Sequence, residues 1–198
     1  SRQSTGSRIS SGQFSIFNQF LNDSISKIFG KHQKLNAKLC IQIAKYLKIS
    51  NDAIKTGLKK VKLPLRMEIV SRKPLIILDG AHNPDKIRTT VTAVSPLLVG
   101  EGAGVRSHRT KELHLIVGFS DNKDITRMIK QLASLHPASI ACTRQTQNHF
   151  RKAANPRIIA DQFRKLLPRT KIEMFLDPKD ALDWSLKQNK RANGIILA

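Results

Sequence analysis

The chain has 198 residues, 40% of them hydrophobic, and its 35 Lys and Arg against 14 Asp and Glu give a formal net charge of +21. This hydrophobic content can form a core, which excludes wholesale disorder. No apolar run approaches the ~20 residues of a membrane-spanning helix, and residues 1–13 lack the apolar segment of a secretory signal, so we expect a cytoplasmic protein with no membrane association.

The positive charge favours anionic partners such as nucleic acid, nucleotides or polyanionic small molecules like glutamate chains. However, the lysines and arginines are spread over every segment and only 5% of the residues are aromatic, so we favour a solvated basic surface over a nucleic-acid interface. Cys40 and Cys142 lie far apart in apolar surroundings, and we expect two buried free thiols in a reducing compartment. No group of His and Cys has metal-ligand spacing, so we predict no metal site.

Residues 1–62 are predicted to be mostly helical, with a poorly ordered N-terminal tail. Apolar residues repeat at helical spacing at Leu35, Leu39, Ile43 and Leu47, which predicts an amphipathic helix over residues 33–47.

A second, shorter helix is expected to begin after Ser50, which can cap it, and to end near Lys60. Pro64 then interrupts the chain, and the pattern changes to alternating strands and helices. We therefore place a domain boundary between residues 62 and 63.

Residues 63–198 alternate between short apolar runs and helix starts. The runs expected to form strands are residues 67–70, 75–78, 113–117, 139–142, 172–175 and 195–197. Helices are expected to begin at Asn83, Asp124, Asn155 and Asp177, and three of these caps precede a proline, which suits the first helical position. The alternation predicts an α/β fold with a mostly parallel sheet and helices on both faces.

Two further expectations concern residues 99–105 and the last apolar run. Residues 99–105 are glycine-rich but lack the order of a phosphate loop, so we expect a flexible surface loop. The last apolar run stops at Ala198, and because a domain would hardly finish inside a buried strand, we expect the chain to be cut there.

Residues 79–84 (DGAHNP) follow a predicted strand at the edge where α/β sheets bind ligands. Asp79 and His82 can project from this turn: the carboxylate can accept from ribose hydroxyls or hold a cationic group, and the histidine can donate to an anion. From the chemistry alone, Asp79 could equally be a turn former and His82 a surface residue.

Residues 118–125 occupy the equivalent place after the next strand. Lys123 offers a positive charge for phosphate or carboxylate, and Asp124 is expected to cap the following helix. Arg66, close to the break at Pro64, suits bidentate contact with a phosphate, although its position alone favours an ordinary surface arginine.

Residues 79–84 resemble the D-G-A-H-N-P motif of the folylpolyglutamate synthase/dihydrofolate synthase family, which is related to the Mur peptide ligases. Other segments resemble family motifs in the same order. Residues 30–37 (GKHQKLNA) resemble G-x-H-Q-x-x-N-A at the end of the central ATPase domain, residues 63–68 (LPLRME) the P-G-R-x-E linker, residues 118–125 (GFSDNKDI) G-x-S-x-D-K-D-I, and Thr143 with residues 151–153 a later T…R-A segment.

The resemblance covers residues 30–198 and implies a Rossmann-like Mur ligase C-terminal domain preceded by the helical end of a central ATP-binding domain. It implies an enzyme in which ATP phosphorylates a folate or dihydropteroate carboxylate, the amine of L-glutamate attacks the acyl phosphate, and Mg²⁺ supports phosphoryl transfer. It further implies that Asn36, Arg66 and Asp79 contact ATP across the domain interface, that His82 positions the acyl phosphate or glutamate, and that Lys123 contacts an anion. Family precedent suggests a monomer.

The chain departs from the family pattern in ways that affect this expectation. Leu65 replaces the linker glycine, Asn122 replaces the first Asp of D-K-D, and the family's N-terminal phosphate loop and Mg²⁺ ligands are not among these 198 residues. We therefore expect the chain alone to be inactive. Two other hypotheses stay open: a non-catalytic basic domain that binds RNA or a large assembly, and a ligase that acts on a Mur-type peptide precursor.

Overall fold

The computed structural model describes residues 31–61, 63–99, 111–144, 152–189 and 194–198. The chain divides into two compact units, Ser1–Lys62 and Leu63–Ala198. Several expectations fall outside the described residues: the order of the N-terminal tail, Gly30, nearly all of the loop at 99–105, and Arg151. Among the described residues, no helix has the length and apolar character needed to cross a membrane.

The first unit contains α2 (Lys31–Tyr46) and α3 (Asn51–Lys60), as the sequence predicted. The Ser50 hydroxyl caps α3 by accepting a hydrogen bond from the backbone N–H of Ala53 at 3.3 Å. The helices pack through a small buried cluster of Ala37, Ile41 and Ile54, with two partly buried neighbours.

The packed face of α2 is not the one that its largest apolar residues suggest. Leu35, Leu39, Ile43 and Leu47 are 63, 57, 51 and 62% exposed, because α2 contacts α3 through its smaller Ala37 face. The same rotation explains why Cys40 is exposed, so the expectation of a buried thiol is wrong there. Cys142 is buried as expected, and burial raises the pKa of its thiol to about 12.

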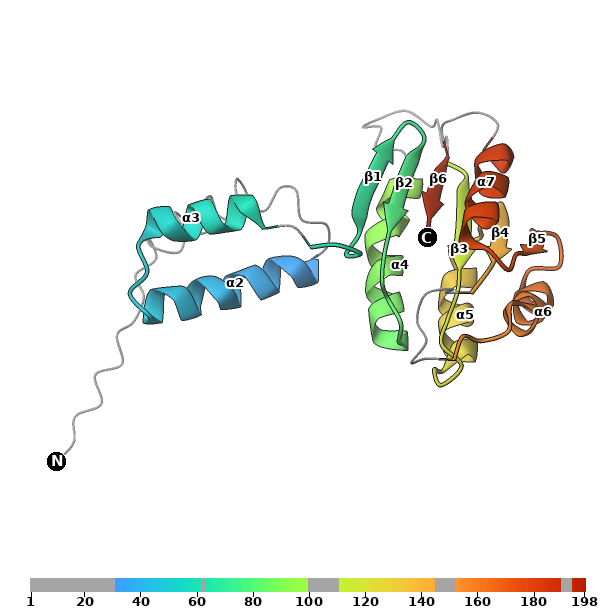
Figure 1. Ribbon diagram of the computed structural model, residues 1–198, viewed down its shortest axis with the longest axis horizontal. Helices are drawn as coiled ribbons and strands as arrows, with labels where there is room; N and C mark the ends of the chain where they lie inside the picture. The colour runs from blue at the N-terminus through green and yellow to red at the C-terminus, as the bar shows by residue number, and fades with distance from the viewer. Residues whose placement is uncertain (1–30, 62, 100–110, 145–151, 190–193) are drawn as a thin grey trace. The chain divides into compact units, whose positions relative to one another are not determined.

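The second unit is built on a six-stranded sheet in the order β1-β2-β6-β3-β4-β5 (Figure 1). Its strands are β1 (Glu68–Arg72), β2 (Leu75–Leu78), β3 (Leu113–Val117), β4 (Ser139–Cys142), β5 (Lys171–Met174) and β6 (Ile195–Leu197). The β1–β2 pair is antiparallel and every other pair is parallel. The last strand, β6, lies in the middle of the sheet between β2 and β3, where Figure 1 marks the C-terminus.

Helices cover the sheet on both faces. The helices α4 (Pro84–Leu98), α5 (Ile125–Ala133) and α6 (Pro156–Leu166) follow β2, β3 and β4, and each leads to a strand further along the sheet in the same direction. The helix α7 (Pro178–Gln188) leads back from β5 to β6, so right-handed crossovers put it on the opposite face. Core packing agrees: Ala181 of α7 clusters with Ile116, Ala141 and Ile196 of the central strands. The predicted α/β fold with a mostly parallel sheet is confirmed.

The four predicted helix starts are also confirmed, and each cap side chain accepts a hydrogen bond from a backbone N–H of the first turn. These interactions satisfy donors that would otherwise lack a partner at the helix end. Because the strands from β2 onward are parallel, all four helix starts lie at the edge of the sheet where β2, β3, β4 and β5 end. We call this edge the carboxyl edge.

Candidate functional site

The loop at residues 79–84 begins where β2 ends, at the carboxyl edge of the sheet. The backbone N–H of Asp79 donates to the carbonyl of Ala198 at 2.7 Å, and the N–H of Ala198 donates to the carbonyl of Ile77 at 2.9 Å. The loop is therefore anchored to the end of the neighbouring central strand. We call residues 79–84 the hexapeptide.

The Asp79 side chain shapes the hexapeptide. It is half-buried, and its carboxylate accepts hydrogen bonds from the backbone N–H groups of Met67, at 3.0 Å, and Ala81, at 2.8 Å. Hydrogen bonds to an ionised acceptor are among the stronger ones in proteins. The sequence left Asp79 open as a ligand contact or as a turn former, and these contacts are those of a turn former. Each of its carboxylate oxygens already has a backbone partner.

The segment that precedes β1 is held against the hexapeptide at two points. Asp79 binds the N–H of Met67, and the N–H of Gly80 donates to the carbonyl of Leu65 at 2.8 Å. Arg66 lies between these two anchored residues, and its side chain is exposed. Arg66 and the hexapeptide are thus neighbours in the structure although the β1–β2 hairpin separates them in the sequence.

Two residues of this segment have an unusual backbone conformation. Leu65 and Met67 have φ values of 54° and 52°, in the left-handed region that glycine adopts with little strain. The family's linker glycine, for which Leu65 stands here, suits this conformation. A Cβ added to Gly80 would come within 3.3 Å of both the Cβ and the carbonyl oxygen of Leu65, so the hexapeptide glycine permits this close approach.

His82 is exposed, and both of its ring nitrogens have partners. Its Nδ1 lies 2.9 Å from the carbonyl oxygen of Gly80, and its Nε2 lies 3.2 Å from the Nζ of Lys86. The imidazole therefore lies over the turn rather than extending freely into solvent.

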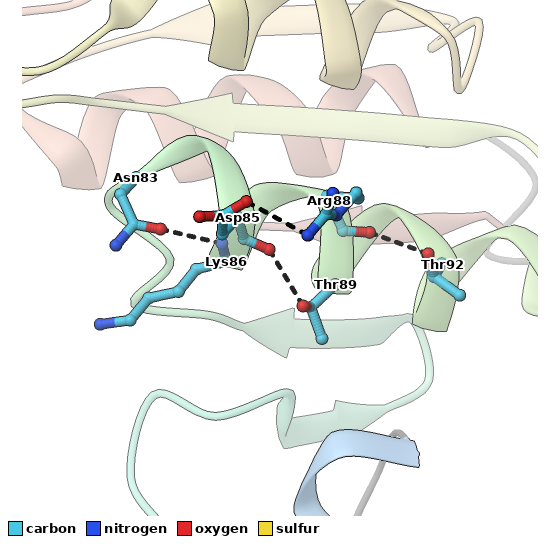
Figure 2. A network of polar contacts seen from close by, with 6 residues as sticks. All are labelled: Asn83, Asp85, Lys86, Arg88, Thr89 and Thr92. Carbon is cyan, nitrogen blue, oxygen red and sulfur yellow. Dashed lines mark hydrogen bonds and ion pairs between the residues drawn. The ribbon is translucent and has the colours of Figure 1, made fainter.

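Polar side chains at the start of α4 contact one another and the helix backbone (Figure 2). Asn83 accepts from the backbone N–H of Lys86 at 2.9 Å, and Asp85 pairs with Arg88 at 3.2 Å. The hydroxyls of Thr89 and Thr92 donate to carbonyls four residues earlier. Since a negative side chain and a cap already occupy this helix end, positive charge for an anion would come from neighbouring side chains.

The loop at residues 118–124 meets the hexapeptide at a shared cavity of about 70 Å³ at the carboxyl edge. Asp79 and Ala81 line it from one loop, Gly118 and Phe119 from the other, and Ala198 from the end of β6. Asp124 caps α5 as predicted, accepting from the N–H of Arg127 at 3.0 Å. Lys123 is half-buried in this loop.

Asn36 belongs to the other compact unit. It lies on α2, is exposed, and donates through Nδ2 to the Oε1 of Gln33 at 3.2 Å. The structure thus brings together Arg66, Asp79 and His82 within the second unit, and a contact of Asn36 with the same ligand stays a prediction.

The contact between Lys86 and His82 was not predicted from the sequence. The signal was available, because residues four apart on a helix or its first turn lie on the same side, and Lys86 follows His82 by four. Among the described residues, no group of three or more His, Cys, Asp or Glu could hold a metal ion.

Comparison with known proteins identifies the fold of the second unit. A family model described as "Mur ligase, glutamate ligase domain" matches residues 65–198. The folylpolyglutamate synthase of Lacticaseibacillus casei is 31% identical over 120 residues, covering 58% of this chain and 26% of that protein. The "Probable bifunctional folylpolyglutamate synthase/dihydropteroate synthase" of Haloferax volcanii is 26% identical over 141 residues, covering 70% of this chain and 15% of that protein.

A solved structure shows the same fold. The Mycobacterium tuberculosis folylpolyglutamate synthase complexed with ADP superimposes with a TM-score of 0.69 at 17% identity, over 86% of this chain and 37% of that one. The chain thus spans about a quarter or less of the length of these two curated relatives. The resemblance inferred from the motifs is confirmed: the chain belongs to the Mur ligase family through its glutamate ligase domain, with folylpolyglutamate synthases among its relatives.

Proposed function

We propose that this chain supplies the C-terminal part of the active site of an ATP-dependent ligase that joins L-glutamate to folate or dihydropteroate. The observation that carries this proposal is that the residues on either side of Arg66, Leu65 and Met67, are hydrogen-bonded to the hexapeptide at the carboxyl edge of the sheet. An exposed arginine presented at this edge suits a phosphorylated ligand. The names of the relatives, folylpolyglutamate synthases among them, supply the substrate class.

The proposed reaction has two steps. An oxygen of the acceptor carboxylate attacks the γ-phosphorus of ATP, ADP leaves, and an acyl phosphate forms. The amine nitrogen of glutamate then attacks the acyl carbon, phosphate leaves, the nitrogen loses a proton, and an amide bond forms. Negative charge spreads over the transferred phosphoryl group in the first step, and fixed cations stabilise it.

Each residue has a proposed role in this site. Arg66 contacts a phosphate through its exposed guanidinium, and Lys123 contacts a carboxylate or phosphate from the loop after β3. Asp79 holds the hexapeptide and Arg66 in place through its two backbone contacts, and His82 lies beside the acyl phosphate or glutamate. Asn36 contributes to nucleotide binding from the first unit, which we propose to be the end of the central ATP-binding domain.

These side chains fit the phosphates of ATP but not a metal ion. The positive groups around the hexapeptide match polyanionic phosphates. Both carboxylate oxygens of Asp79 already accept hydrogen bonds from backbone N–H groups. We therefore propose that the Mg²⁺ ligands and the phosphate loop of such a ligase lie outside this chain, and that the chain alone does not hydrolyse ATP.

The test is a titration of the full chain with MgATP, followed by backbone amide NMR. We expect weak binding, with shifts concentrated at residues 66 and 79–86, and no release of phosphate. Arg66→Met should weaken binding about tenfold, which corresponds to ~1.4 kcal/mol, whereas Arg169→Met on a distant turn should not. Magnesium-dependent turnover by the pure chain, or shifts that avoid the hexapeptide, would contradict the proposal.

The net charge of +21 supports a second candidate, a non-catalytic domain that binds RNA. A generic single-stranded RNA added to the same sample distinguishes the two. Salt-sensitive RNA binding with shifts spread over the lysines of both units, and no response to MgATP, would favour this candidate. Shifts at the hexapeptide on addition of MgATP would instead favour the ligase. We propose that this ligase acts as a cytoplasmic monomer on small-molecule substrates.

A further inference from the structure

His82 is held by hydrogen bonds at both ring nitrogens. Nδ1 faces the carbonyl oxygen of Gly80 at 2.9 Å, and Nε2 faces the ammonium of Lys86 at 3.2 Å. These partners decide where the ring proton lies. A carbonyl oxygen only accepts, so Nδ1 must carry a hydrogen, and an ammonium only donates, so Nε2 must present its lone pair. These contacts fit the tautomer protonated at Nδ1 alone, which is the less common tautomer of free histidine.

The backbone of Lys86 is held on both sides by hydrogen bonds to side chains. Its backbone N–H is held by the Asn83 cap at 2.9 Å, and its carbonyl accepts from the hydroxyl of Thr90 at 3.1 Å. Its side chain is half-buried and, in Figure 2, extends back beyond the first turn of α4. The nearest carboxylate in sequence, Asp85, is paired with Arg88 at 3.2 Å.

We propose that Lys86 and His82 act as a pair in the candidate site: the Lys86 ammonium holds His82 as the Nδ1-protonated tautomer, and the ring in turn holds the ammonium toward an anion. This inference rests on the proposed function for its relevance to catalysis. With Nδ1–H directed at Gly80 and Nε2 accepting from Lys86, the imidazole has no N–H left for an anion. An acyl phosphate or carboxylate beside His82 is then met by the remaining N–H groups of the Lys86 ammonium, and His82 orients that ammonium.

The tautomer is measured directly by the ¹⁵N chemical shifts of the imidazole in two-bond ¹H–¹⁵N correlation spectra of the full chain at pH 8. We expect the Nδ1-protonated pattern for His82 in the native chain. Lys86→Met, which keeps the length of the side chain but cannot donate, should shift the ring toward the Nε2-protonated pattern. Lys86→Arg, which only donates, should restore the native pattern. Lys130→Met on α5 should leave it unchanged.

An Nε2-protonated ring in the native chain, or a native pattern that persists in Lys86→Met, would overturn the role of Lys86. Amide spectra of each variant show whether α4 is intact, and the arginine variant tests the same point with the donor retained. The readout needs no nucleotide. A chain with the expected tautomer but no response to MgATP would remove the proposed function and leave the hydrogen-bond arrangement standing, whereas the reverse result would remove only the inference about Lys86.

Discussion

At the scale of single residues, His114 is a buried titratable group that couples folding to pH. It is 2% exposed, its Nδ1 lies 2.8 Å from the Oγ of Ser139, and its Nε2 lies 3.9 Å from the carboxylate of Glu112. Burial lowers the pKa of His114 below its usual value of about 6.5, and the Glu112 carboxylate opposes this only in part. The folded protein therefore favours the neutral ring.

This shift predicts a loss of stability in mild acid. Above pH ~6.5 the ring is neutral in both states, and the full stability is present. As the pH falls from there through the folded pKa, the unfolded state binds the proton more readily, so the free energy of unfolding decreases. Urea unfolding at pH 7.5, 6.5 and 5.5 measures the trend. His114→Gln should flatten it, whereas His136→Gln, at an exposed site, should not; equal slopes in all three proteins would refute the assignment.

Gly194 predicts a second effect at this scale. A Cβ at this position would lie 2.9 Å from the carbonyl of Glu112, 2.9 Å from the side-chain oxygen of Asn189 and 3.1 Å from Nε2 of His114. We expect Gly194→Ala to destabilise the second unit by about 1–3 kcal/mol, because the backbone around β6 must shift. Gly57→Ala on α3 is the control, since nothing lies within 4 Å of its added methyl group. Chemical denaturation followed by CD distinguishes the two, and an unaffected Gly194→Ala would contradict the packing described.

The sequence predicted that Asp79 and His82 lie at the carboxyl edge of the sheet, but it did not predict their contacts. Asp79 and His82 followed from the placement of residues 79–84 after a strand. The backbone partners of Asp79 could not be predicted, because they depend on the left-handed conformation at Leu65 and Met67, which neither residue type favours. Only the folded chain shows that the linker and the hexapeptide share these contacts.

At the scale of elements, the helix starts were the most predictable feature. An Asx residue followed by proline satisfies a free backbone donor and preorganises the first turn, and both effects are local. The packed face of α2 was not predictable in the same way. Its leucine repeat is the more apolar stripe, yet the contact with α3 uses Ala37 and Ile41, because the neighbouring helix and not the local repeat decides which face packs.

The cap of α4 gives a prediction at the element scale. Asn83→Ala removes the acceptor for the N–H of Lys86, so we expect the free energy of unfolding to fall by ~1 kcal/mol. The first turn of α4 should also exchange its amide hydrogens faster. Asn155→Ala removes the equivalent cap of α6 and serves as the matched control, because it should cost a similar amount of stability without changing exchange at the hexapeptide. Hydrogen exchange read by NMR separates these outcomes, and unchanged exchange in α4 would count against the cap.

At the scale of the whole second unit, β6 joins two parts of the sheet. It pairs with β2 on one side and β3 on the other, and Ile196 is fully buried beside Ile116 and Ala141. The sequence predicted this strand but not its central position, because strand order depends on the crossover from β5 rather than on local pattern. The parallel sheet and its two covered faces followed from the alternation of strands and helices.

The central position of β6 predicts a large effect from a small change. Ile196→Ala should reduce the free energy of unfolding by about 2–4 kcal/mol, since it leaves a cavity where α7 meets the middle of the sheet. Val70→Ala is the control, because Val70 is 51% exposed on the edge strand β1 and should cost less than half as much. Urea unfolding of both variants measures the difference. Similar values for the two would mean that the centre of the sheet is more tolerant than its packing indicates.

The insertion of β6 between β2 and β3 also sets an order of assembly. The β1–β2 hairpin is the first part of this sheet to leave the ribosome, yet it can pair with the parallel strands only through residues 195–197. Contacts between segments this distant in sequence form slowly, since a long loop must close before they stabilise anything. During synthesis one edge of the hairpin therefore stays unpaired until residues 195–197 are made, and the candidate site acquires its shape only after β6 has inserted.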